Sequence, residues 1–319
     1  MMTCNLRRPA LVLAIVAIAS FLDAAGHAIA AQGRRRGPPD AAQSFVYQGV
    51  TRRYVVRAPR GADRSGQPLP VVFVLHGGGG DAANAERMTG FTRLVQREQV
   101  IVVYPEGTSA RARIPTLTWN AGHCCGYAME RRIDDVGFIS ALLDTLAVRY
   151  RVDPARVYAT GMSNGAMMSH RLGRELSHRI AAIAPVVGAV FGDEALPPQP
   201  VSALMINGLL DASVPAAGGP PGGRFKGEWD GTPTMPNVAQ GTFWARAGGC
   251  AAEPRRDQRG TLMYWRWDCP SGRAVELYQV EDNGHAWPGG TSGSRLGDKP
   301  STSMDATAVI WAFFKAHAR

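Results

Sequence analysis

Short apolar runs alternate with segments of helical periodicity along most of the chain. The runs contain little alternation of apolar and polar residues, which is typical of strands buried on both faces of a parallel sheet. We expect such strands at residues 71–75, 100–104, 157–160, 180–187, 201–207 and 274–280. Between them, apolar residues recur every three or four positions, which predicts helices with one face on the sheet. The expected helices cover residues 81–97, 134–150, the segment after residue 163, 237–247 and 305–317.

This order of strands and helices predicts an α/β fold, with a mostly parallel central sheet and helices on both faces. Residues 44–59 alternate apolar and polar side chains around a glycine, which predicts an edge hairpin. Residues 106–133 and 212–236 show no periodicity, and loops of this length in compact domains tend to be functional. Asp134-Asp135 stands where a helix begins, so we expect these carboxylates to cap it rather than to serve in acid/base catalysis.

The first 30 residues have the pattern of a signal peptide. Arg7 and Arg8 precede an apolar run at residues 11–22, and Ala28-Ile29-Ala30 offers a small-x-small cleavage site. The apolar run is too short to span a bilayer comfortably. We therefore predict a signal peptide at 1–30, a basic Gly/Pro-rich tether at 31–43 and a single catalytic domain at 44–319. The mature protein is expected to be secreted, to the periplasm or the extracellular space, with no membrane partner.

The chain has 319 residues and a formal net charge of +9. Part of this charge is local, because Arg34-Arg35-Arg36 lie in the predicted tether. A nucleic-acid partner would require basic residues gathered on one element with aromatic residues between them, and the sequence contains no such element. We expect a solvated basic surface on a monomer, with no nucleic-acid partner.

Loss of the predicted signal peptide leaves four of the five cysteines, an even number that favours disulfides in an exported protein. Cys250 and Cys269 flank a predicted hairpin, so we expect them to pair. Cys124 and Cys125 form either a vicinal disulfide or two free thiols. His123 precedes them, but no second ligand pair stands at zinc spacing, so we expect no metal and no cofactor.

The most informative motif is Gly161-Met162-Ser163-Asn164-Gly165. It stands between a predicted strand and a predicted helix, which is the context of a nucleophile elbow. In such an elbow a sharp turn holds the serine hydroxyl at the top of the sheet, and the flanking glycines let the backbones approach closely. Ser163 is therefore the candidate nucleophile.

A serine nucleophile needs a base, and on this architecture the chain order is serine, acid, histidine. His285 follows a predicted strand in a Gly-flanked loop, from which an imidazole can reach Ser163. The other histidines after the elbow lie on or at the ends of helices: His170, His178 and His317.

The acid must orient the histidine and stabilise its protonated form. Asp211 follows the strand expected at 201–207, and we assign it this role. Asp282 is close to His285 in sequence and cannot easily reach its far nitrogen, and Asp193 follows no clear strand end.

The oxyanion of a tetrahedral intermediate needs preorganised N–H donors. We expect one from Asn164 and a second from Gly78, in the Gly-rich loop 77–80 that follows a central strand. This loop lacks the lysine or acidic residue of phosphate-binding glycine motifs. Trp119 and Trp287 either form walls of an acyl pocket or only pack in the interior.

Several separate blocks of this sequence resemble those of one family of α/β-hydrolases, the polyhydroxybutyrate depolymerases and feruloyl esterases. The blocks are LHGGGG at 75–80, TWNAG at 118–122, DDVGF at 134–138, GMSNG at 161–165 and GHAWPGG at 284–290. The resemblance is collinear from about residue 47 to 315 and implies an exported serine esterase with the triad Ser163, Asp211 and His285.

The resemblance also implies the substrates: polyhydroxyalkanoate-type oligomers, or feruloyl and acetyl esters of plant polysaccharides. Many extracellular polymer depolymerases of this family carry an added substrate-binding domain, for which this chain has no room. Two alternatives remain from the residues. A serine peptidase would use the same triad, and a non-catalytic carbohydrate-binding protein could keep the same fold.

Overall fold

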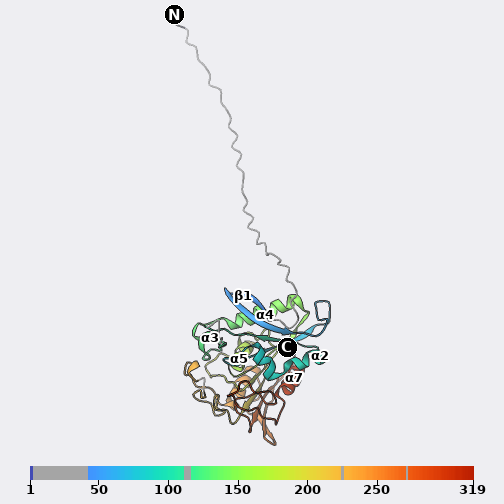
Figure 1. Ribbon diagram of the computed structural model, residues 1–319, viewed down its shortest axis with the longest axis vertical. Helices are drawn as coiled ribbons and strands as arrows, with labels where there is room; N and C mark the ends of the chain where they lie inside the picture. Colours follow the sequence, from blue (N-terminus) through green and yellow to red (C-terminus); the bar gives the residue numbers. More distant parts are fainter. Residues whose placement is uncertain (3–41, 111–115, 224–225, 271) are drawn as a thin grey trace. The chain divides into compact units, whose positions relative to one another are not determined.

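The computed structural model describes residues 1–2, 42–110, 116–223, 226–270 and 272–319 (Figure 1). Nearly all of the predicted signal peptide and of the predicted tether lies outside the described residues, so both remain predictions. The described residues from 42 onward belong to one compact unit. Within the described residues, no helix is long and apolar enough to cross a membrane.

The described residues contain ten strands that form one sheet. In chain order the strands are β1 (Gln43–Tyr47), β2 (Val50–Arg57), β3 (Leu69–Leu75), β4 (Ile101–Pro105), β5 (Val152–Met162), β6 (Ala182–Val186), β7 (Ser202–Gly208), β8 (Arg255–Arg259), β9 (Leu262–Trp267) and β10 (Val275–Val280). Their order across the sheet is β1-β2-β4-β3-β5-β6-β7-β10-β9-β8. The central strands are parallel to one another: β4, β3, β5, β6, β7 and β10. Antiparallel strands extend the sheet at both edges, where β2 pairs with β4 and β9 pairs with β10.

Helices cover both faces of the sheet (Figure 1). The α-helices are α1 (Ala82–Thr89), α2 (Val95–Glu98), α3 (Gly126–Glu130), α4 (Asp135–Arg149), α5 (Asn164–Glu175), α6 (Asn237–Gly248) and α7 (Ala306–Ala316), and the 3-10 helices are η1 (Phe91–Leu94) and η2 (Lys226–Glu228). Apolar residues of α1 and α7 share one core, and those of α4, α5 and α6 share the other. Strand β3 supplies Val71, Phe73 and Leu75 to one core and Val72 and Val74 to the other. This confirms the predicted α/β fold.

The differences from the predicted elements have local causes. The helix expected at 81–97 is divided, because Gly90 adopts a left-handed conformation (φ 65°). The Gly90 N–H donates to the Glu86 carbonyl, and α1 ends there. The loop expected at 106–133 contains the short helix α3. The predicted hairpin between the cysteines is β8–β9, and it continues the main sheet because β9 pairs with β10.

Candidate active site

Ser163 occupies a sharp turn between β5 and α5. Its backbone has φ 57° and ψ −123°, a conformation that a non-glycine residue adopts only where its surroundings impose it. The Ser163 N–H donates to the carbonyl of Val186 (3.0 Å). A Cβ at Gly161 or Gly165 would collide with backbone atoms of β3. The motif therefore folds as the expected elbow.

Asp211 and His285 are in direct contact. The Nδ1 atom of His285 lies 2.8 Å from Oδ2 of Asp211, and the other carboxylate oxygen accepts hydrogen bonds from the N–H groups of Ser213 and Val214 (2.8 Å each). The Asp211 side chain is 1% exposed and that of His285 is 19% exposed. A neutral imidazole making this contact carries its proton on Nδ1, which leaves the lone pair on Nε2.

The three residues follow three parallel strands. Ser163 follows β5, Asp211 lies beyond β7 and His285 beyond β10, and the carboxyl ends of parallel strands share one edge of the sheet. The competing acids contact other groups. Asp282 accepts from the hydroxyls of Ser301 and Ser303, and Asp193 contacts the imidazole of His123.

The loop that carries His285 is held by side chains that the sequence analysis did not identify. The His285 N–H donates to Asp298 (2.6 Å), and the Asn283 amide donates to the carbonyls of Gly284 and Ala286. Gly284 provides space for Asp298, because a Cβ there would collide with the carboxylate. The Asn283-Gly284 turn could have been noticed next to the histidine, but no local pattern identifies Asp298.

His76 organises the Gly-rich loop rather than titrating. Its buried ring lies between the Gly77 carbonyl (Nδ1, 2.8 Å) and the Gly107 N–H, which donates to Nε2 (3.0 Å). Burial lowers the pKa of His76 to about 4, so the ring is neutral at physiological pH. The loop is thereby tied to the segment that follows β4.

A cavity of about 70 Å³ lies beside Ser163. Its lining residues are Gly78, Gly79, Thr116, Thr118, Cys125, Ser163, Asn164, Glu228 and Trp229. The predicted oxyanion residues Gly78 and Asn164 thus share one cavity with the candidate nucleophile. Glu228 and Trp229 come from the long loop at 212–236, and sequence reasoning did not single them out.

Neither tryptophan proposed as an acyl-pocket wall lines this cavity. The Trp119 indole is fully buried and donates to the His76 carbonyl (3.0 Å). The Trp287 indole is 1% exposed and donates to Thr307 (3.0 Å). The pocket-wall interpretation is therefore corrected: both side chains pack in the interior.

Trp119 instead acts through its backbone. The Asn164 side chain accepts from the Trp119 N–H (2.7 Å) and donates to the Trp119 carbonyl (3.0 Å). The same amide nitrogen lies 3.6 Å from Sγ of Cys124. This clamp connects the first residue of α5 to the loop 119–125.

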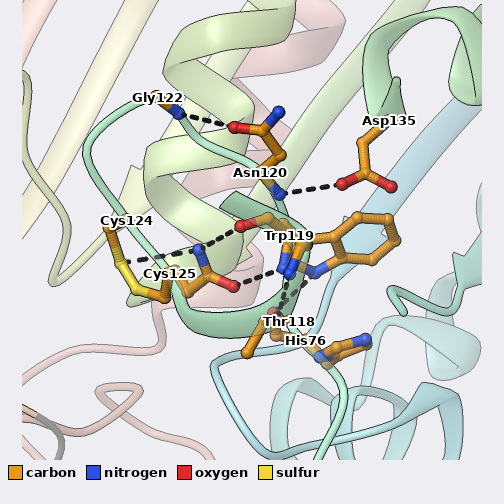
Figure 2. Close-up of a disulfide and its surroundings, with 10 residues drawn as sticks. His76, Thr118, Trp119, Asn120, Gly122, Cys124, Cys125 and Asp135 are labelled. Atoms are coloured by element: carbon orange, nitrogen blue, oxygen red, sulfur yellow. Dashed lines mark hydrogen bonds between the residues drawn. A yellow bond between two sulfur atoms is a disulfide. The ribbon is translucent and has the colours of Figure 1, made fainter. Parts of the chain in front are cut away.

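Cys124 and Cys125 form a disulfide in that loop, which resolves the two alternatives left open by the sequence. Figure 2 shows this disulfide beside Trp119 and Asn120. The Cys125 N–H donates to the Trp119 carbonyl (3.0 Å), and Cys124 forms an isolated β-bridge with Trp229. The disulfide therefore contacts Asn164 of the elbow through Cys124 and forms part of the cavity wall through Cys125.

The two adjacent aspartates have different roles. Asp134 caps α4 as predicted, accepting from the Gly137 N–H (2.8 Å). Asp135 does not cap the helix. It is fully buried, pairs with Arg52 (2.6 Å) and accepts from the Asn120 N–H (2.8 Å) (Figure 2). This buried ion pair holds the loop 119–125 at Asn120.

His123 holds the outer side of the same loop. Its Nδ1 lies 2.7 Å from Asp230 and its Nε2 lies 2.9 Å from Asp193. Partial burial opposes protonation of His123, but the hydrogen bonds and charges of the two aspartates outweigh it and raise its pKa. Among the described residues, no group of three or more His, Cys, Asp or Glu side chains is arranged to hold a metal ion.

Comparisons with known proteins agree with this architecture. The chain is 33% identical over 266 residues to the "Putative esterase NocK" of Nocardia uniformis subsp. tsuyamanensis, covering 78% of this chain and 74% of that protein. It is 28% identical to "Feruloyl esterase B" of Piromyces equi over 76% of this chain and 44% of that protein. It is 29% identical to "Poly(3-hydroxyalkanoate) depolymerase C" of Paucimonas lemoignei, over 40% of this chain and 30% of that protein.

Among solved structures, the acetyl xylan esterase from Aspergillus awamori has a TM-score of 0.55 at 13% identity, over 77% of this chain and 94% of that one. At this identity the likeness shows a shared fold, which is the α/β-hydrolase fold. The family model described as "Esterase PHB depolymerase" matches residues 53–216. The chain therefore belongs to the PHB depolymerase family of esterases and is a carboxylic-ester hydrolase.

Proposed function

We propose that the protein is an exported serine esterase that forms an acyl-enzyme, with Ser163 as nucleophile, His285 as base and Asp211 as its partner. The observation that carries the proposal is the buried contact between Asp211 and His285 at the sheet edge where Ser163 forms an elbow. Asp211, held by two backbone N–H groups, keeps the Nδ1 proton in place, so that Nε2 is the atom able to accept a proton.

The proposed reaction has two steps. The Ser163 hydroxyl attacks the ester carbonyl while its proton passes to His285, and the N–H groups of Asn164 and Gly78 stabilise the oxyanion. The alcohol leaves with the proton from His285. Water then attacks the acyl-enzyme with His285 again as base, which releases the acid and restores Ser163.

The proposed substrates are polyhydroxyalkanoate-type oligomers or feruloyl and acetyl esters of polysaccharides. Relatives named as feruloyl esterases, as a bifunctional acetylxylan esterase/xylanase and as a poly(3-hydroxyalkanoate) depolymerase support this range. Export is supported by the predicted signal peptide and by two disulfides, which persist in oxidising compartments.

The test is turnover of a matched ester panel by the wild-type protein and Ser163→Ala. The panel contains p-nitrophenyl acetate and butyrate, methyl ferulate and a soluble 3-hydroxybutyrate oligomer. We expect Ser163→Ala and Asp211→Asn to lower kcat by a factor of about 10⁴ or more. Ser169→Ala, which changes a buried serine of α5, the helix that Ser163 precedes, is the control. A folded Ser163→Ala variant that keeps wild-type turnover would exclude the serine mechanism.

A further inference from the structure

Glu228 is the one acidic or basic side chain among the described residues that line the cavity beside Ser163. The other described lining residues are glycines, threonines, Ser163, Asn164, Trp229 and the disulfide-bonded Cys125. A charge in this position has no part in the proposed acyl transfer. We therefore consider a separate role for Glu228, which rests on the function proposed above.

The Glu228 carboxylate has a defined place in the cavity. Its Oε2 atom lies over Gly126, where a Cβ would collide with it. Gly126 also has a positive φ of 50°, so glycine suits both the backbone and the neighbouring carboxylate. The absence of a side chain at Gly126 thus leaves space for the Glu228 carboxylate.

The backbone next to Glu228 is attached to the loop 119–125 at two points. Trp229 forms a β-bridge with Cys124, and the Asp230 N–H donates to the His123 carbonyl (3.1 Å). The Asp230 side chain contacts the same histidine, which is also held by Asp193. Glu228 therefore precedes a segment that is fixed to the wall of the active-site cavity.

The Glu228 side chain is exposed to solvent. Among the residues that the structure describes, none forms a hydrogen bond or an ion pair with its side chain. A carboxylate in this state accepts hydrogen bonds from a hydroxyl group and repels another anion at short range. The walls beside it, Trp229 and Cys125, offer apolar contact instead.

We propose that Glu228 determines acyl specificity: it favours acyl groups that carry a neutral hydroxyl and disfavours acyl groups that carry a second carboxylate. Two of the three proposed acyl groups carry the favoured hydroxyl, which is aliphatic in a 3-hydroxybutyryl group and phenolic in a feruloyl group. The third, acetyl, carries neither a hydroxyl nor a carboxylate, so Glu228 neither favours nor disfavours it. The same repulsion acts on the free acid product and favours its departure from the cavity.

The experiment compares acyl groups of similar size with one leaving group. The esters are p-nitrophenyl butyrate, p-nitrophenyl 3-hydroxybutyrate and the p-nitrophenyl monoester of succinic acid. For Glu228→Gln, we expect the ratio of kcat/KM for the succinyl ester to that for the butyryl ester to rise about tenfold over wild type. This rise is expected to shrink as salt increases, because the interaction is between charges. For Glu228→Leu, the preference for the hydroxybutyryl over the butyryl ester is expected to fall several-fold.

Glu130→Gln is the matched control, since Glu130 is exposed like Glu228 but lies in α3, outside the lining of the cavity. Both specificity ratios should be unchanged in this variant. If both ratios are unaltered in Glu228→Gln and Glu228→Leu while the butyryl ester is still hydrolysed, the role of Glu228 is overturned and the proposed function is not. A folded wild-type protein that hydrolyses no ester would overturn the proposed function and this inference with it.

Discussion

The two disulfides lie in different kinds of structure. The Cys250–Cys269 disulfide joins the segment after α6 to the segment after β9. Its cysteines are 19 positions apart in sequence and have a Cα–Cα distance of 4.0 Å. Cys124 and Cys125 are neighbours in sequence, and Cys125 lines the cavity beside Ser163. One bond crosslinks distant parts of the chain, and the other shapes a loop.

This difference separates stability from function. A crosslink stabilises a fold mainly by restricting the unfolded chain, and for a loop of this length the effect is about 3 kcal/mol. A bond between adjacent residues closes almost no loop and restricts the unfolded chain little. The vicinal disulfide therefore acts through the local arrangement of the loop 119–125, whose stability must come from other contacts.

The largest effect is expected from the buried ion pair that holds this loop. Asp135→Asn leaves Arg52 charged and buried without a counter-ion, which should cost about 3–5 kcal/mol of unfolding free energy in urea titrations. Activity should fall as well, because asparagine offers one acceptor oxygen where Asp135 serves two donors, the Arg52 guanidinium and the Asn120 N–H. Asp144→Asn, on the same helix but with a side chain 68% exposed, should cost less than about 1 kcal/mol. Equal effects of the two variants would contradict the role of Asp135 in holding the loop.

The crosslinking disulfide comes next. Cys250→Ser combined with Cys269→Ser should lower the unfolding free energy by about 3 kcal/mol. Its kcat/KM at 25 °C should equal that of wild type for every ester, because neither cysteine lines the cavity. Thermal unfolding and ester kinetics on the same samples measure both quantities. A changed substrate ranking would contradict the separation of roles.

The reverse pattern is expected for the vicinal pair. Cys124→Ser combined with Cys125→Ser should change the unfolding free energy by no more than about 1 kcal/mol. Its kcat/KM should fall about tenfold, since the loop that contacts Asn164 and Trp229 loses its shape. The measurement is kinetics on methyl ferulate beside p-nitrophenyl acetate. Loss of stability as large as in the other double variant, with unaltered kinetics, would refute this prediction.

The smallest effect concerns His123. Its raised pKa means that its contacts with Asp193 and Asp230 stabilise the fold fully below the unfolded-state pKa, about 6.5, and that this contribution is lost as pH rises through the folded-state pKa. The contribution should be at most about 1 kcal/mol, because the aspartates are 61% and 41% exposed. Urea titrations of wild type and His123→Gln on both sides of this window should therefore converge at high pH. A difference that grows with pH would have the wrong sign.

The buried histidines do not disturb this measurement. Burial lowers the pKa of His76 to about 4 and that of His170 to about 3. Both rings stay neutral across the window in which His123 titrates. His170 accepts a hydrogen bond from the Trp244 indole (2.9 Å), which is consistent with a neutral ring.

What could be predicted from sequence depended on how local the signal was. The central strands, the elbow and the loop positions of Asp211 and His285 follow from short apolar runs and glycine-flanked turns, because these signals lie within a few residues of the features they predict. Asp135 was assigned with Asp134 to capping, since its partner Arg52 is 83 positions away and no periodicity relates them. Trp119 and Trp287 carried no local sign of whether their indoles face a cavity or the core. Glu228 was missed because its loop has no regular pattern.

The contact between Asp211 and His285 joins residues 74 positions apart, and it depends on β10 lying between β7 and β9. Parallel pairing of this kind is assembled late and slowly, because long segments must be ordered before their contacts form. The site is therefore inert until most of the sheet exists. A chain that crosses a membrane before folding would therefore be inactive as a hydrolase during transport and would become active only after folding at its destination.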